Sequence, residues 1–477
     1  MCLVFYIFLF MNSFGGNFLC SATDSTTVTP TKYVPIDITG NEVNANAIWG
    51  TADNWNDFKN SVPDNITSNE DKDAYKNYNH GVDGYAAYYT KSHNETESHN
   101  ETGGIPNDGK VSVGNIPFQI KASWNNDCVR LGWGNDQQFT KQINLSTSNI
   151  KNLYILGVTA GNSPNKISPP TKFWYTVSSD SSQGTKKVAN LYNYFANPST
   201  WGNDANIIGY TQNYHVRTCS REIYRPTSDS DDKPNMQCCK LDTSGLTLDN
   251  NNKLTIEYHT SNDSSENDGK GQFLVIFAIT AEVEYDNNIT LSDVKHDSFK
   301  IACETSGDKQ VKISTTKGLN SESMTTAVFP YTPEAYEGTT YYCTIYDDTK
   351  KAYYYFEVMT KKSLKLVAQI PSGLVYNGAA QQLVTGCSTL NANDAARPES
   401  ENTLLKANIY LRIKNATGTS ELDTGWCNLN SLANLTAINA GTYNIYYYID
   451  EDNLGDYELI NEPSTVTITV TNTVTIG

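Results

Sequence analysis

The chain has 477 residues, more than a single hydrophobic core usually organises, so we expect roughly two to four domains. Hydrophobic residues make up 38% of the sequence, which is enough to build globular cores. The 35 basic residues are outnumbered by 52 acidic ones, giving a net charge of −17, and this balance excludes nucleic acid as the expected partner.

The first 22 residues have the features of a secretory signal peptide. An apolar block, LVFYIFLF, covers residues 3–10, and Cys20-Ser21-Ala22 supplies small residues at a cleavage site, although no Lys or Arg precedes the block. We predict cleavage after Ala22, a linker over residues 23–30, and a secreted or extracellular protein that is either free or associated with a cell surface. The final TVTITVTNTVTIG alternates like a strand and is too polar for a membrane helix, so we expect no transmembrane segment.

Short β-type runs separated by Gly, Asn, Pro and Ser turns extend from residue 31 to about residue 285. In KLTIEYH, Leu254, Ile256 and Tyr258 share one face, which predicts a strand with one side in the core. FLVIFAI, residues 273–279, is apolar on both faces and predicts a central strand covered on both sides. The clearest predicted strands are residues 111–120, 151–157, 171–177, 213–224, 252–259 and 271–285.

These strands indicate an all-β fold, and residues 31–285 are expected to form a jelly-roll β-sandwich. The runs VGNIPF (113–118), LYILGVTAGN (153–162) and FLVIFAIT (273–280) resemble secreted bacterial jelly-roll modules attached to carbohydrate-active and cell-surface proteins. The resemblance covers about half of the chain. It implies a carbohydrate-binding type of module without catalytic residues.

Residues 286–363 resemble an immunoglobulin-like β-sandwich. Cys303 and Cys343 lie in this segment, and EGTTYYC ends at the second of them. Tyr341, two residues before Cys343, matches the tyrosine corner of such sandwiches. No Trp lies between the two cysteines, so the resemblance is to an Ig-like sandwich and not to a true immunoglobulin domain.

Residues 364–477 resemble the short β-sandwich repeats of bacterial surface proteins. The resemblance rests on LVYNGAAQQLV (374–384) and AGTYNIYYY (440–448). Asn377-Gly378 predicts a tight hairpin turn, and Tyr443, Ile445 and Tyr447 are expected on one face of a strand. The family is structural or adhesive, which implies that the second and third segments space a functional head from a surface.

The cysteines suggest an oxidising compartment. Of the ten, cleavage after Ala22 removes Cys2 and Cys20 and leaves eight, in an even number within each segment. We predict disulfides Cys303–Cys343 and Cys387–Cys427. The pairing among the cysteines of the first segment stays open; they are Cys128, Cys219, Cys238 and Cys239.

Nothing in the sequence has the spacing of a known catalytic motif or metal site, so we expect a non-enzyme without a cofactor. His215 and Cys219 would allow a thiol–imidazole dyad, but a disulfide is the favoured role for Cys219 among its neighbouring cysteines. The acidic residues 228–232 (SDSDD) suit calcium, yet they lack the EF-hand spacing, which favours a plain surface loop.

Two aromatic loops of the first segment form the predicted ligand site. Sugar sites use a flat aromatic ring beside amide and carboxylate groups, and Trp133, between two glycines, is the first choice. The other predicted ligand-binding residues are Trp124, Asn126, Asp127, Asn135 and Asp136. The competing interpretation is that these tryptophans pack in the sandwich, and a second cluster, WGND at 201–204, has the same ambiguity.

The sequence therefore predicts a secreted or cell-surface, non-catalytic binding and adhesion protein with a glycan-binding jelly roll as its head. One alternative is a purely structural or protein-adhesive surface component without a glycan pocket. Another is an accessory part of a glycoside hydrolase system.

Overall fold

The computed structural model is an all-β protein, as the sequence predicts at this level. The residues described contain one α-helix, α4 (Glu399–Asn408), and one 3-10 helix, η3 (Leu429–Asn434). They are residues 29–38, 43, 45, 47–49, 86–90, 104–122, 127–132, 139–160, 171–192, 206–211, 214, 216–218, 235–258, 273–286, 289–304, 309–318, 324–415, 423–439, 441–449, 455–460 and 471–476.

A 10-stranded antiparallel sheet runs through the first two predicted segments, and we call it the large sheet. Its path is β11 (Ile207–Tyr210), β13 (Gln237–Leu241), β8 (Ile150–Ala160), β15 (Phe273–Val283), β1 (Thr31–Ile36), β21 (Ala352–Met359), β20 (Thr340–Asp347), β18 (Lys309–Ser314) and β19 (Thr325–Ala327), with β6 (Val129–Gly132) also on β15.

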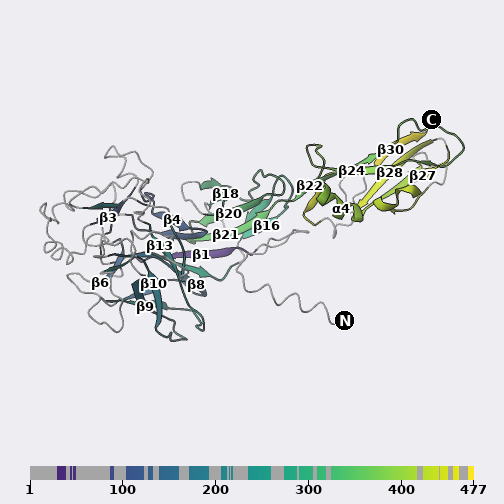
Figure 1. The fold of residues 1–477 in the computed structure, drawn as a ribbon. Coiled ribbons are helices and arrows are strands. Elements are labelled where there is room, and N and C mark those ends of the chain that lie inside the picture. Colours follow the sequence, from purple (N-terminus) through teal and green to yellow (C-terminus); the bar gives the residue numbers. More distant parts are fainter. Residues whose placement is uncertain are drawn as a thin grey trace.

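The strand β1 joins two regions that lie far apart in the sequence. Tyr33 faces Glu282 of β15 on one side and Tyr353 of β21 on the other. The expected boundary between residues 285 and 286 therefore falls within one continuous hydrogen-bonded sheet. Figure 1 shows β1 lying between the β8 side and the β20–β21 side of this sheet.

The predicted central strand is confirmed, because every side chain from Phe273 to Ile279 is buried. The residues alternate between two cores on opposite faces of the large sheet, as the period of a strand requires, with a bulge between Ile276 and Ala278. The first core receives Leu274, Ile276 and Ile279, and the second core receives Phe273, Val275, Phe277 and Ala278.

The first core is closed by a four-stranded sheet. Its order is β10 (Lys187–Leu191), β9 (Thr171–Ser178), β14 (Asn252–Glu257) and β7 (Thr140–Leu145). Leu254 and Ile256 of β14 and the following Tyr258 are buried in this core, whereas Lys253 is exposed. The predicted one-sided strand is thus confirmed.

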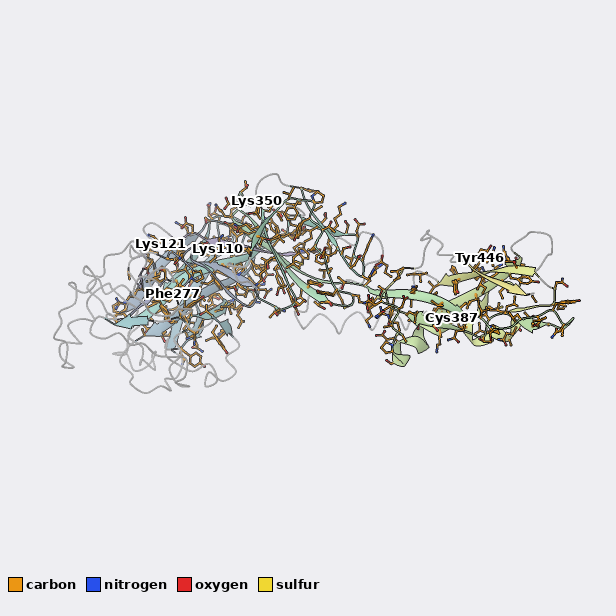
Figure 2. All side chains as sticks on the ribbon, turned by 90° about the horizontal axis from the view of Figure 1, so that it is seen from above. Lys110, Lys121, Phe277, Lys350, Cys387 and Tyr446 are labelled. Carbon is orange, nitrogen blue, oxygen red and sulfur yellow. The ribbon has the colours of Figure 1, made fainter. Side chains whose placement is uncertain are left out.

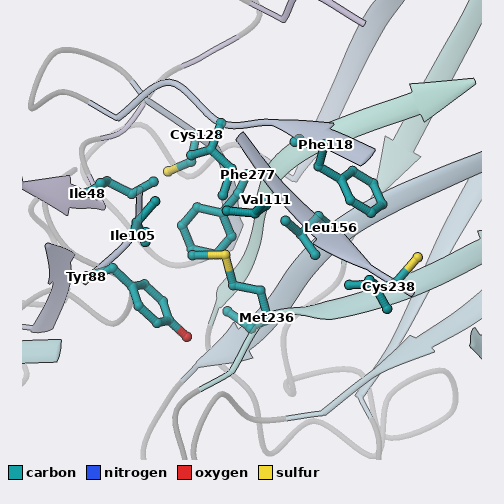
Figure 3. Packing of buried hydrophobic residues seen from close by; sticks show 14 of the residues in the cluster. Ile48, Tyr88, Ile105, Val111, Phe118, Cys128, Leu156, Met236, Cys238 and Phe277 are labelled. Carbon is teal, nitrogen blue, oxygen red and sulfur yellow. The ribbon is translucent and has the colours of Figure 1, made fainter. Parts of the chain in front are cut away.

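The second core lies on the other face, under the hairpin β4 (Lys110–Val113) and β5 (Ile116–Gln119). Residues 111–120, predicted as a single strand, fold back on themselves because Gly114 adopts a φ of 59° in a two-residue turn. The small sheet β12 (Val216–Thr218), β3 (Ala86–Tyr89) and β2 (Ile48–Trp49) also contributes. In Figure 3, Phe277 and Leu156 pack with Val111, Ile48 and Tyr88 of these elements.

A third core lies between the β18–β20–β21 part of the large sheet and the pair β16 (Ile289–Ser292) and β17 (Lys300–Cys303). Tyr341 is buried there, and its hydroxyl accepts a hydrogen bond from the backbone N–H of Tyr336 at 2.7 Å. A tyrosine corner makes this kind of bond to the backbone a few residues upstream.

The C-terminal part has a core of its own and extends away from the rest of the molecule in Figure 1. Its elements are β22 (Lys362–Gln369), β24 (Gly386–Leu390) and β29 (Tyr457–Leu459) in one sheet; β26 (Cys427–Asn428), β25 (Ile409–Asn415), β28 (Gly441–Ile449) and β30 (Thr471–Ile476) in another; and the pair β23 (Gln381–Gln382) and β27 (Thr436–Ala437).

Two expectations for this part need correction. The helix α4 interrupts a segment expected to be wholly β. Asn377-Gly378 does not form a turn with two positive φ values, because only Gly378 has one, 74°, while the Asn377 side chain accepts a hydrogen bond from the N–H of Ala379. No hairpin strands flank this turn: β22 pairs with β24 and β29, and β23 pairs with β27.

Polar side chains hold the C-terminal part against the second segment, and we call this contact the polar joint. Glu337 Oε2 accepts hydrogen bonds from the N–H of Ser363 at 2.9 Å and from Arg397 Nη2 at 2.7 Å. His296 Nδ1 lies 2.7 Å from Glu458 Oε2. Each of these contacts includes at least one ionisable side chain.

Candidate functional site

Of the predicted ligand-binding residues, only Asp127 belongs to the described part of the chain; Trp124, Asn126, Trp133, Asn135 and Asp136 lie outside it. Asp127 is 0% exposed. Its Oδ1 accepts the N–H of Ala47 at 2.7 Å and its Oδ2 the N–H of Ile48 at 2.9 Å. A carboxylate used in this way holds the chain at β2 and does not fit the predicted role of a hydroxyl partner on the surface.

The WGND cluster at 201–204, the acidic loop 228–232 and the pair His215 and Cys219 also lie outside the described residues. Within the described residues, no group of three or more His, Cys, Asp or Glu side chains is arranged for a metal ion.

No disulfide joins the seven cysteines that the structure describes, so the predicted bridges Cys303–Cys343 and Cys387–Cys427 are not formed in it. The members of each pair do contribute to one core: the first pair to the third core, the second pair to the C-terminal core. The thiols of Cys387 and Cys427 instead face backbone carbonyls of Ser388 and Thr424.

Burial also affects the reactivity of these thiols. Desolvation raises the pKa of Cys387 to about 12 and holds the pKa of Cys128, Cys238 and Cys343 above its usual value. A thiol acts as a nucleophile through its thiolate, so these four side chains behave as apolar core residues at neutral pH.

The described residues contain an aromatic surface on the outer side of β25 and β28. Along β25, Ile409, Leu411 and Ile413 are buried, so the alternate residues Tyr410, Arg412 and Lys414 point outward. Tyr446 and Tyr448 of β28 lie opposite Arg412 and Tyr410 in the ladder. We call the four rings of Tyr410, Trp426, Tyr446 and Tyr448 the aromatic face, on which Figure 2 labels Tyr446.

Three of the four rings, those of Tyr410, Tyr448 and Trp426, lie close enough to form one connected group, which we call the platform. The ring centroids of Tyr410 and Tyr448 are 6.0 Å apart, and those of Trp426 and Tyr448 are 5.5 Å apart. Trp426 is 41% exposed, the most accessible of the four. Strand pairing fixes the backbone beneath Tyr410 and Tyr448, and Trp426 directly precedes β26, which pairs with β25.

Charged groups border the platform. The guanidinium of Arg412 lies 5.9 Å from the Trp426 ring centroid, and Lys414 Nζ lies 6.0 Å from that of Tyr446. Arg412 donates from Nε to Asp423 Oδ1 at 2.5 Å and from Nη2 to Asp423 Oδ2. These hydrogen bonds hold the pKa of Asp423 well below its usual range, so the carboxylate stays ionised.

This combination suits a sugar. An aromatic ring accepts the C–H face of a pyranose, and a fixed guanidinium–carboxylate pair supplies donors and acceptors for hydroxyl groups. The sequence prediction placed the ligand site in the first segment and missed this face, although one signal for it is present in the residues. In NIYYY, residues 444–448, tyrosines occupy both parities of one strand, so some of them have to point away from the core.

No family model matches the chain, and no curated protein sequence matches it either. In the described part of the chain, no helix combines the length and the apolar character needed to cross a lipid bilayer.

Proposed function

We propose that the chain is a secreted or cell-surface, non-catalytic binding protein that recognises carbohydrate. The observation that carries the proposal is the aromatic face, where an accessible Trp426 stands beside Tyr448 and an ordered Arg412–Asp423 pair. Carbohydrate is therefore the ligand class, with no nucleic acid partner, no catalytic role and no cofactor; calcium is not needed for the contacts described.

We infer three β-modules behind this function. The first is a jelly roll over residues 31–285, supported by two sheets packed on one core. The second is an Ig-like sandwich over residues 286–363, supported by the Tyr336–Tyr341 hydrogen bond. The third is a β-repeat over residues 364–477, supported by its separate core. Residues 1–22, the proposed signal peptide, lie outside the described residues.

The proposal places the binding function in a different part of the chain from the one that the sequence favours. The sequence favours the jelly roll as the binding head, on Trp133 and Trp124, and that site remains a proposal about residues outside the described part. The described residues support a binding role for the C-terminal module, which the sequence suggests as a spacer. Both assignments are compatible with one carbohydrate-binding protein.

Protein adhesion is the second candidate, and one observation favours it. Val375 and Tyr376, in the turn before β23, are 64% and 55% exposed. Apolar side chains that lie side by side at the surface are typical of protein contacts. A protein partner would engage this turn, whereas a glycan would engage the aromatic face.

The test is a glycan array followed by affinity electrophoresis in the polysaccharides that the array selects. Trp426→Ala is expected to weaken binding by about tenfold or more, because one stacked ring supplies much of a weak sugar site. Its free energy of unfolding should change by less than about 1 kcal/mol, since the ring is 41% exposed.

Tyr336→Ala is the matched control, because that aromatic ring is 80% exposed but lies in the second segment, away from the aromatic face. It should bind as the unchanged chain does. Glycan binding that survives Trp426→Ala would rule out the aromatic face. Failure of every glycan to bind, together with a protein partner lost on Tyr376→Ser, would favour the adhesive function.

A further inference from the structure

A polar pocket opens at one end of the four-stranded sheet, far along the sequence from the aromatic face. Three chain segments line it: residues 144–148 where β7 ends, Asp180 just after β9, and residues 250–253 where β14 begins. These ends lie together because β14 pairs with both β7 and β9, placing Asn252 opposite Leu145 and Lys253 opposite Ser178. The cavity volume is about 920 Å³.

The lining of the pocket is made almost entirely of hydrogen-bonding groups. Apart from Leu145, every lining residue is Asn, Ser, Thr, Asp or Lys. Asp180 and Lys253 are its only charged residues and have opposite signs, so the lining is neutral in sum. An apolar ligand would leave these groups without partners, which is costly, and a strongly charged ligand would find no opposite charge to match.

The polar groups of the pocket are held in place by the fold. Asn251, at a φ of 47°, donates from Nδ2 to Asp180 Oδ2 at 2.5 Å, which links two of the three segments. Asn252 donates from Nδ2 to the carbonyl of Thr147 at 2.9 Å and thereby links the third. The side chains are therefore ordered before binding, which lowers the entropic cost of recognising a ligand.

Asn252 also offers an acceptor that the described part of the chain does not satisfy. The residue is 1% exposed, and its Oδ1 is buried without a hydrogen-bond donor in reach. Buried amide oxygens are nearly always bonded, so this one leaves a hydrogen bond unmade at a residue that lines the pocket.

We propose that this polar pocket is a second binding site and that it takes a neutral saccharide unit. Its volume is that of a small-ligand pocket, and its amide and hydroxyl groups match a ligand that is itself made of hydroxyl groups. A divalent cation is a poorer fit, because the lining provides the carboxylate of Asp180 alone. The site does not depend on the aromatic face.

The experiment is saturation-transfer-difference NMR on the full chain with glucose, mannose, galactose and N-acetylglucosamine at millimolar concentration. Intact mass is recorded first, because Asn144 begins an Asn-Leu-Ser glycosylation sequon. We expect a signal from at least one sugar. The exposed variants Asn251→Ala and Asp180→Ala should each lower the apparent affinity by about tenfold, as loss of a hydrogen bond to a ligand does.

Asn393→Ala, an exposed asparagine in a turn of the C-terminal part, is the control and should bind normally. Trp426→Ala should also retain the monosaccharide signal, which separates this site from the aromatic face. The proposal is overturned if no sugar binds, if both pocket variants bind as the unchanged chain does, or if calcium chloride alone perturbs the pocket. Loss of all signal in Trp426→Ala would overturn it too, while leaving the proposed function standing.

Discussion

The second segment is joined to its two neighbours in different ways. On the N-terminal side, β1 pairs with β15 and β21 at once, and Tyr33, Tyr346, Tyr353 and Tyr355 share a core with Phe277. On the C-terminal side, the polar joint combines side-chain contacts that are partly open to water, among them the Arg397–Glu337 ion pair, with backbone hydrogen bonds that join Lys361 to Lys295 and Gly338. Backbone ladders and apolar burial do not depend on pH near neutrality, whereas exposed ion pairs respond to pH and salt. We therefore expect the first two segments to unfold together and the C-terminal module, which has its own core, to unfold separately.

The largest effect is expected from cutting the chain on either side of the second segment. A fragment of residues 29–285 loses β21, so β1 becomes an edge strand and the apolar face of the second core loses its tyrosine cover. We expect that fragment to aggregate. A fragment of residues 29–360 should unfold in one cooperative transition, and residues 361–477, which hold the whole C-terminal core, should fold alone.

Size-exclusion chromatography and thermal unfolding followed by circular dichroism measure these outcomes. A monomeric 29–285 fragment with the melting temperature of the 29–360 fragment would mean that the large sheet contributes little to stability. Because the first two segments form this sheet together, we call it the shared sheet below.

A second prediction contrasts charges buried within the shared sheet with charges at its surface. Lys309 Nζ lies 3.3 Å from Asp347 Oδ2, and both side chains are 1% exposed. Lys309→Met removes one partner and leaves a buried carboxylate, so we expect a loss of about 3–5 kcal/mol in urea unfolding. Lys351→Met is the control, because its pair with Asp348 is mostly exposed and its removal should change stability very little. Similar losses for both variants would contradict the contrast.

Local pattern predicts the strands that have a clear inside and outside. β14 follows directly from its alternating pattern, and β15 follows from its apolar run on both faces. The spacing of Tyr341 to Cys343 likewise points to its hydrogen bond with the backbone a few residues upstream. The pairing of β1 with β21 cannot be foreseen, because the partners are more than three hundred residues apart and no local pattern records a long-range pair. Sequence pattern alone therefore assigns the two strands to different domains.

The candidate sites depend on more than local pattern as well. Sequence pattern does not predict α4. Its ten residues include Ser, Thr and Asn, which have modest helix propensity, and they show no long apolar periodicity. Asp127 looks like a surface carboxylate beside Trp124, yet its two backbone donors come from Ala47 and Ile48, about eighty positions away. The polar pocket likewise arises from three separate strand ends that only the sheet register brings together.

A third prediction concerns the polar joint itself. Glu337→Gln removes the charge that Arg397 and Ser363 contact, and we expect a loss of about 1–2 kcal/mol with faster hydrogen exchange at Ser363 and Ala392. Glu401→Gln is the matched control, since Glu401 of α4 pairs with Lys362 of β22, and both elements contribute to the C-terminal core. Faster exchange spreading into β20 and β21 would show that the joint is not separate from the shared sheet.

The smallest expected effect is that of pH on stability. It distinguishes the polar joint from the shared sheet most directly. Partial burial alone would raise the pKa of Glu337, but hydrogen bonds from Ser363 and Arg397 outweigh it and lower the pKa. A lowered pKa in the folded state contributes stability that is present above the free value of about 4.3 and is lost as the pH falls through the folded value. Acid should therefore loosen the polar joint.

The shared sheet should respond to base instead. Burial raises the pKa of Tyr33 and Tyr353 above the usual value, so their contribution is fully present below about pH 10 and is lost as the pH rises through the folded value. Small-angle scattering across the acid range should show the molecule becoming less rigidly extended, while its near-ultraviolet circular dichroism stays constant. At alkaline pH, a rise in tyrosinate absorbance should accompany unfolding. His296→Gln, which removes the imidazole that contacts Glu458 across the joint, isolates the part due to Glu337. If acid disrupts the tyrosine signal before it changes the scattering, the shared sheet is the weaker joint and the comparison is reversed.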